Sequence, residues 1–130
     1  MYPLVVLLIP VLMLFHLVGP VPEDLGIHNG RLSPCPGTAH CAEELWESSN
    51  PEADLTRLSA LISDLPRSQI VSETEDYVHA EVSSAFFGFV DDLELLAVQD
   101  GIQARSVSRL GDSDLGVNSR RLSLLHDSLS

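Results

Sequence analysis

The chain contains no lysine, and its seven positive charges are all arginines set against 19 aspartates and glutamates. Over 130 residues the formal net charge is −12. A chain this acidic is repelled by the phosphate backbone of nucleic acids, so the sequence predicts no nucleic-acid binding. An anionic membrane surface repels it as well, so any membrane contact must come from apolar residues. The acidity favours a solvated, soluble surface over a dock for a basic partner.

Basic residues are also missing from the N-terminal segment, where the run from Leu4 to Val18 is almost wholly apolar. As a helix, the first 18 residues would rise about 27 Å, just short of a hydrocarbon core of about 30 Å. A cleaved signal normally has a basic start and a small-residue cleavage site. Here the first arginine is Arg31, and the segment ends in Gly-Pro-Val-Pro. We therefore expect residues 1–21 to be a membrane tether, with a cleaved signal as the alternative.

Cysteine is scarce as well. The pair Cys35 and Cys41 encloses a five-residue gap, which is a poor match to the spacing of zinc sites or of thioredoxin-like redox pairs. We predict a disulfide, which would contribute about 2 kcal/mol in the chain-entropy model. The alternative is a metal set completed by His28 and His40. The spacing favours the disulfide, and no metal or other cofactor is expected.

Residues 22–130 are enough for one modest domain. Apolar residues at helical spacing predict a packing helix between Pro51 and Pro66, and a last helix that begins after Asn118 as its N-cap. The predicted strands are Ser68–Glu73, Tyr77–Ser84, Phe89–Val98 and Ile102–Arg109. This order, without a crossover helix, indicates an α+β fold. We expect an antiparallel sheet of about four strands with two helices packed on one face, preceded by an N-terminal hydrophobic helix.

Asp100-Gly101 is the strongest hairpin signal in the chain. If these two residues form the turn, Asp92 lies directly opposite Arg109, and we predict an ion pair between them. The same register places Ser106 on the helix-facing side, which disfavours it as a nucleophile. Asp91 also falls on that side, so it requires solvent, a backbone donor or an arginine as a partner.

The other side of the predicted sheet is expected to be exposed and charged. It carries Asp92, Arg105 and Arg109, with His79 and Glu81 joining them if their strand is the neighbour. A histidine beside carboxylates could act in acid–base chemistry, and the arginines could hold an anionic substrate. The simpler interpretation, which we favour, is a row of salt bridges on an open face.

A loop of turn-forming residues, Gly111–Asn118, connects the last strand to the last helix. We expect Asp114 to accept hydrogen bonds from Arg109 or Arg121 and so to lock the loop against the sheet. The predicted structural network therefore consists of Asp91, Asp114, Asn118 and Arg121.

The stretch from Arg105 to Asn118 (RSVSRLGDSDLGVN), with Arg121 beyond it, resembles the signature of the domain of unknown function family 1499. Phe89–Asp92 matches the strand that precedes this signature, and the Cys35–Cys41 segment resembles the family's early cysteine-proline element. The resemblance covers about Leu25 to His126. It implies the fold but no established activity. Members occur in bacteria and photosynthetic lineages, often behind an export or membrane segment.

Together these features predict a non-catalytic accessory or interaction domain, for which a protein partner is possible. The expected location is a membrane, with the domain on the non-cytoplasmic side, in a periplasm or thylakoid lumen, or secreted if residues 1–21 are cleaved. The alternative is a small-ligand-binding or hydrolytic domain that uses the polar face of the sheet. A concave pocket around the five polar-face residues would favour that alternative.

Overall fold

The structure is a computed structural model that describes residues 19–84, 88–111 and 113–130. The elements in chain order are β1 (Ile27–His28), β2 (Arg31–Leu32), β3 (Cys41–Glu47), α2 (Pro51–Asp64), β4 (Ser68–Glu73), β5 (Tyr77–Ser83), β6 (Val90–Val98), β7 (Gly101–Ser108) and α3 (Val117–Asp127). The predicted N-terminal hydrophobic helix lies outside the described residues. No helix within the described ranges has both the length and the apolar character needed to cross a membrane.

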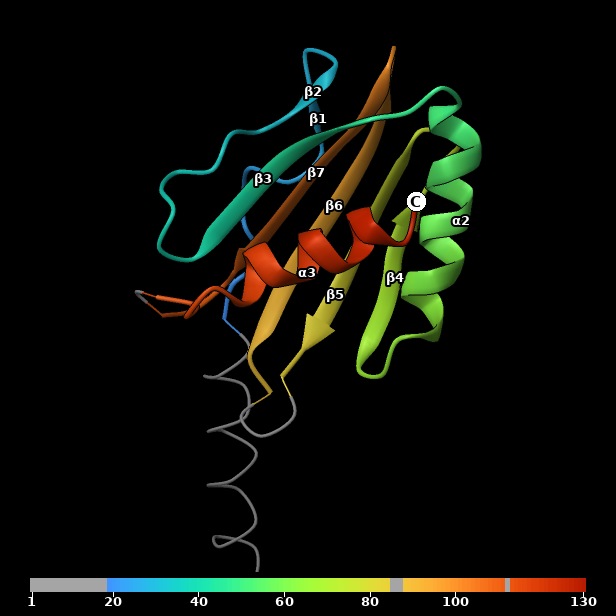
Figure 1. Ribbon diagram of the computed structural model, residues 1–130. Coiled ribbons are helices and arrows are strands. Elements are labelled where there is room, and N and C mark those ends of the chain that lie inside the picture. The colour runs from blue at the N-terminus through green and yellow to red at the C-terminus, as the bar shows by residue number, and fades with distance from the viewer. Residues whose placement is uncertain (1–18, 85–87, 112) are drawn as a thin grey trace, which may run out of the picture.

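The fold is α+β, as predicted, with an antiparallel sheet in the order β3-β7-β6-β5-β4. Both helices lie on one face of this sheet, which confirms the predicted layering (Figure 1). The sheet has five strands rather than four. The two short strands β1 and β2 form a separate ribbon, and β2 packs against β6 and β7.

The helices and the sheet enclose one apolar core. Its fully buried members come from both helices and from four strands: Trp46, Leu55, Leu58, Ile62, Val78, Ala80, Leu93, Leu95, Ile102, Ala104, Leu122 and Leu125. The Asn50 side chain accepts a hydrogen bond from the backbone N–H of Ala53, and Pro51 follows as the first helical residue. Both features stabilise a helix start, and α2 occupies the interval between Pro51 and Pro66 that the sequence predicts.

The β6–β7 hairpin is present, but its register differs from the prediction. Val98 pairs with Gly101, so the two turn residues are Gln99 and Asp100. Asp92 lies opposite Val107 instead of Arg109. Because side chains alternate with a period of two, this two-residue change in pairing leaves every side chain on its predicted face.

β3 lies beside β7 and reaches the turn end of the hairpin. Gly101 pairs with Glu47, and a Cβ atom at Gly101 would clash with the carbonyl oxygen of Trp46. The glycine is therefore required for the close approach of two strands rather than for a left-handed turn. The sequence analysis did not predict β3, because its residues do not separate into an apolar and a polar face.

Candidate functional site

The predicted polar face is not exposed. A segment that we call the N-terminal arm, residues 19–34, covers it and includes β1 and β2 (Figure 1). Asp92 and Glu94 are fully buried, and Arg105 is 1% exposed. The expectation of an open face was wrong because the arm contains only two-residue strands among prolines and glycines, a pattern that does not indicate a sheet cover.

Asp92 is the centre of the first group of buried charges. Arg109 donates from Nε to Oδ2 at 2.8 Å and from Nη2 to Oδ1 at 3.0 Å. The Nε2 atom of His79 lies 2.7 Å from Oδ1 of the same carboxylate. Arg109 also donates to Glu81 at 3.0 Å. The predicted Asp92–Arg109 ion pair is therefore present, and it forms diagonally across the strands, within reach of the long arginine side chain.

The surroundings of Asp92 hold it in the charged form. Burial acts to raise the pKa of Asp92, but the hydrogen bonds from Arg109 and His79, together with their charges, outweigh burial and lower the pKa below its ordinary value of 3.8. The hydrogen bond to Asp92 raises the pKa of Arg109 in return. An ionised Asp92 with a bidentate arginine is a hydrogen-bond acceptor and not a proton donor.

Glu94 is the centre of the second group, which holds the arm to the sheet. It accepts hydrogen bonds from the Tyr77 hydroxyl at 2.6 Å, from the backbone N–H of Gly26 at 2.8 Å and from Arg105 at 3.2 Å. Arg105 also donates to Asp24 of the arm at 2.6 Å. Burial, followed by the hydrogen bond to Glu94, raises the pKa of Tyr77. The arm is thus fixed by charge-assisted contacts at two of its residues.

The five candidate residues therefore fall into two groups. His79, Glu81 and Arg109 form one group with Asp92, whereas Arg105 belongs with Glu94. A cavity of about 390 Å³ beside the arm is lined by Arg105 and Arg109, but not by His79 or Glu81. The acid–base candidates and the anion-binding candidates consequently do not face one common pocket.

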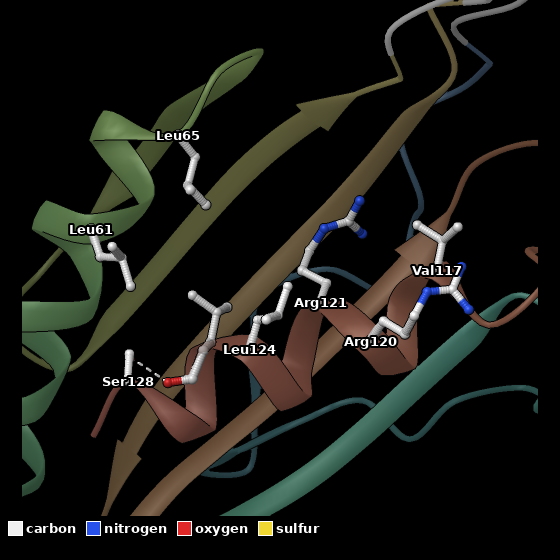
Figure 2. Close-up of a pocket in the computed structure, with 8 residues that line it drawn as sticks. Leu61, Leu65, Val117, Arg120, Arg121, Leu124 and Ser128 are labelled. Atoms are coloured by element: carbon white, nitrogen blue, oxygen red, sulfur yellow. Dashed lines mark hydrogen bonds between the residues drawn. The ribbon is translucent and has the colours of Figure 1, made fainter. Parts of the chain in front are cut away.

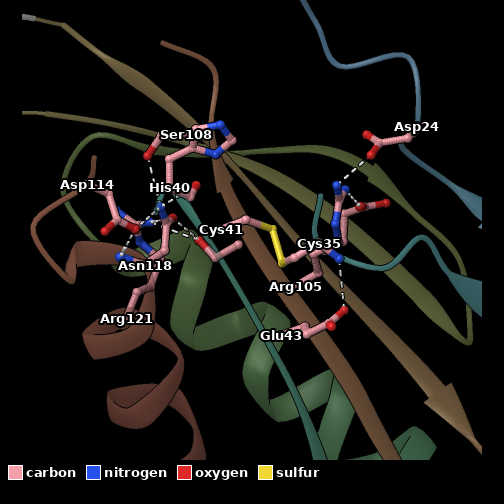
Figure 3. The surroundings of a disulfide bond; sticks show 12 residues. Asp24, Cys35, His40, Cys41, Glu43, Arg105, Ser108, Asp114, Asn118 and Arg121 are labelled. Atoms are coloured by element: carbon pink, nitrogen blue, oxygen red, sulfur yellow. Dashed lines mark hydrogen bonds and ion pairs between the residues drawn. A yellow bond between two sulfur atoms is a disulfide. The ribbon is translucent and has the colours of Figure 1, made fainter. Parts of the chain in front are cut away.

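The predicted structural network forms around Asn118 on the helical face. Its side-chain amide donates to Asp114 at 2.7 Å and to Ser108 at 2.9 Å. Its side-chain oxygen accepts from Ser106 at 2.6 Å and from Arg121 at 2.9 Å. These bonds join the loop, the sheet and α3 (Figure 3). Asn118 does not cap α3, because the helix begins at Val117 with Gly116 as its N-cap.

Asp114 and Arg121 belong to this network. The expected hydrogen bond between them is not formed. Asp114 accepts from the backbone N–H groups of Gly116 and Asn118. Burial acts to raise the pKa of Asp114, and the hydrogen bonds from Asn118 and Gly116 lower it overall. The carboxylate partner of Arg121 is Asp91, at 2.9 Å. The buried position of Asp91 is thus compensated by an arginine, one of the three partners that the sequence allowed.

The disulfide between Cys35 and Cys41 is present, with the two Cα atoms 5.7 Å apart (Figure 3). It closes the loop that leads into β3, and Cys41 is the first residue of that strand. A disulfide sulfur is not a thiolate, so the alternative metal set with His28 and His40 is incompatible with this arrangement.

An open groove, which we call the helix trough, lies between α2 and α3 (Figure 2). Its volume is about 590 Å³, and its lining residues are Leu61, Leu65, Val117, Arg120, Arg121, Leu124, Leu125 and Ser128. Leu124 is 72% exposed. A second cavity of about 550 Å³ shares Val117 and Arg121 with the trough.

The helix trough was not predicted from the sequence, because all the apolar residues of the first helix were assigned to packing. Leu55, Leu58 and Ile62 do pack into the core, whereas Leu61 and Leu65 are partly exposed. The apolar residues of α2 cover a wider part of the helix surface than contact with the sheet requires, and this width indicated a second apolar surface.

The fold and the site define a small α+β domain that carries two helices and an apolar trough on one face of its sheet and a covered charge network on the other. The model of a family described as protein of unknown function (DUF1499) matches residues 31–129, and the chain belongs to this family. Comparisons with curated proteins and with solved structures gave no match.

Proposed function

We propose that this protein is a non-catalytic accessory domain that acts outside the cytosol and binds an apolar ligand through the helix trough. The observation that carries the proposal is the contrast between the two faces of the sheet. The charged residues of one face are paired with one another beneath the N-terminal arm, whereas leucines of the two helices that cover the other face line an open groove. Apolar clefts of this size are the usual form of small-ligand sites.

The alternative, a hydrolytic or ligand-binding site on the polar face, has less support. His79 and Arg109 both donate to Asp92, and Arg105 bridges two carboxylates. A substrate would have to displace the arm and break these pairs before it reached them. Breaking one buried pair is costly, at about 3–5 kcal/mol.

The proposed location rests on the disulfide and on the apolar residues 1–21. Disulfides persist in oxidising compartments such as the periplasm and are rare in the cytosol. We therefore place the domain on the non-cytoplasmic side of a membrane, with the N-terminal segment as its attachment.

Binding of a neutral apolar dye, N-phenyl-1-naphthylamine, tests the proposed function. We expect the fluorescence of the dye to increase when the native protein is added. The Leu124→Glu variant, which places a charge in the helix trough, should not produce this increase. Leu45→Glu is the matched control, because Leu45 is 66% exposed on β3 and does not line the trough. No dye binding by the native protein, or equal loss in both variants, would contradict the proposal.

A further inference from the structure

We propose that the helix trough takes a single-chain amphiphile with a carboxylate head, a long-chain fatty acid, whose head group lies at Arg120 and Arg121. This inference rests on the proposed function and names the ligand class of the same site. The chain of the ligand would lie along the leucines that α2 and α3 present to each other across the trough (Figure 2).

The charged residues of the trough favour an anionic ligand. The chain as a whole carries 19 acids against seven arginines. Two of those arginines, Arg120 and Arg121, line the trough, and no acid among the described residues lines it. Arg121 is paired with Asp91, so Arg120 is the cation of the trough that has no carboxylate partner among the described residues. Charge complementarity favours an anionic head over a neutral or cationic one.

The guanidinium of Arg121 has a geometry that suits a carboxylate. Its guanidinium contacts to Ser106, Asn118 and Asp91, the ones found among the described residues, all run through Nη1. The edge formed by Nε and Nη2 has none of these bonds, and the side chain is 16% exposed. Two parallel N–H groups on one edge match the two oxygens of a carboxylate. Arg120 is an exposed second cation at the same end of the trough.

The acids beside the trough favour a carboxylate over a more highly charged head group. Asp91 and Asp114 line the adjoining cavity, close to Arg121. Asp91 is paired with Arg121, and Asp114 is paired with the start of α3. They nevertheless add negative charge to a domain of net charge −12. Repulsion from these acids is smallest for a head with one charge.

The rest of the trough suits an alkyl chain. Apart from the two arginines and Ser128, every lining residue is leucine or valine. The volume of about 590 Å³ lies within the range of about 300–1,000 Å³ typical of small-ligand sites. Since each methylene removed from water changes binding about fourfold, affinity should rise with chain length until the trough is filled.

Displacement of the bound dye by matched amphiphiles tests the inference, with dodecanoate, dodecan-1-ol and dodecylammonium each used below its micelle-forming concentration. Dodecanoate should displace the dye at a concentration about tenfold lower than the alcohol, and dodecylammonium should be the weakest. Arg120→Gln should reduce the preference for the acid. Arg31→Gln, an exposed arginine on β2, should leave it unchanged. Arg121 is not substituted in this test, because it also donates a hydrogen bond to Asn118.

The possible outcomes separate the inference from the function on which it rests. Equal displacement by the acid and the alcohol overturns the carboxylate assignment while the trough stands as a binding site. A preference that survives Arg120→Gln at full strength overturns the placement of the head group. If the dye itself does not bind, the proposed function fails first.

Discussion

Arg109 and Arg57 show how strongly the surroundings decide what an arginine contributes. The Arg109 side chain is 4% exposed and forms a bidentate pair with Asp92, whereas the Arg57 side chain is 60% exposed and pairs with Asp54 one turn away. Burial removes the water that would otherwise solvate a charge left without a partner. Exposed pairs of the second kind are weak, because water and salt screen them.

We therefore predict that Arg109→Leu lowers the free energy of unfolding by about 3–5 kcal/mol, since Asp92 and Glu81 lose their shared cation. The matched control Arg57→Leu should change it by about 0.5 kcal/mol or less. Urea unfolding followed by circular dichroism measures both. Equal losses in the two variants would show that the buried network contributes no more than a surface pair.

The dependence of stability on acid pH is a second test of the paired carboxylates. The pKa of Asp92 is lowered in the folded protein, so the unfolded chain binds a proton more readily, and stability from this group is present above about pH 4 and lost as the pH falls below it. Asp114 acts in the same direction. We expect the urea midpoint to be lower at pH 3 than at pH 5.

The variant Asp92→Asn serves as the control for this acid dependence. It should be less stable at neutral pH, because Arg109 loses its main partner, and its urea midpoint should fall less steeply between pH 5 and pH 3. A native protein whose stability is unchanged over that interval would contradict the assignment of Asp92 as an ionised, paired group.

At the scale of elements, the N-terminal arm converts an open sheet face into an interior. Three contacts hold it: the pair between Asp24 and Arg105, the bond from Gly26 to Glu94, and a bond from the backbone N–H of Leu32 to Gln103 at 2.9 Å. Leu32 also packs on Tyr77 and Leu96 in a small second apolar cluster. The arm is therefore held in place by the charged residues beneath it, and those residues are shielded from water by the arm.

We predict that Asp24→Asn loosens the arm, because Arg105 keeps only Glu94 as a charged partner. Backbone hydrogen exchange at Gly26 and Leu32 should become about fivefold faster, which corresponds to about 1 kcal/mol for a partly exposed pair. Exchange in β6 should change less. Glu23→Gln, a neighbouring exposed acid, should leave both amides unaffected, and equal exchange rates in the two variants would argue against the Asp24 contact.

The same elements show which features the sequence could predict. The helix from Pro51 and four strands follow from periodicity, and the side of the sheet on which each residue lies survived a wrong hairpin register. β3 was missed because it is an edge strand: Glu44 lies on the same face as Trp46, which breaks the apolar pattern. Because β3 was not predicted, the close approach of β3 that requires glycine at position 101 could not be predicted either.

The arm and the helix trough could not be predicted, because both depend on tertiary arrangement. Two-residue strands have no periodicity to detect. The trough exists because α2 and α3 lie on the sheet with a gap between them, a separation that neither helix encodes alone (Figure 1). His79, Glu81 and Arg109 were correctly grouped with Asp92, whereas Arg105 belongs with Glu94, and the accessibility of the whole set depended on the arm.

At the scale of the whole molecule, the described domain and the N-terminal segment have opposite characters. The domain is acidic and has no lysine to attract it to an anionic bilayer, whereas the run from Leu4 to Val18 is apolar and uncharged. The electrostatic contribution of the domain therefore opposes attachment to an anionic membrane, and any such attachment must come from apolar residues.

We predict that the full chain sediments with membranes and resists alkaline carbonate extraction, while its domain is digested by protease added to the non-cytoplasmic side. The double variant Leu8→Arg and Leu12→Arg should move the chain to the soluble fraction, since each arginine at the centre of a membrane segment costs about 2.5–3.5 kcal/mol. Mass spectrometry of the N-terminus distinguishes tether from signal: a native chain that begins at Met1 yet stays in the aqueous phase would refute attachment. A chain that begins after residue 21 would instead identify a cleaved signal and a secreted domain.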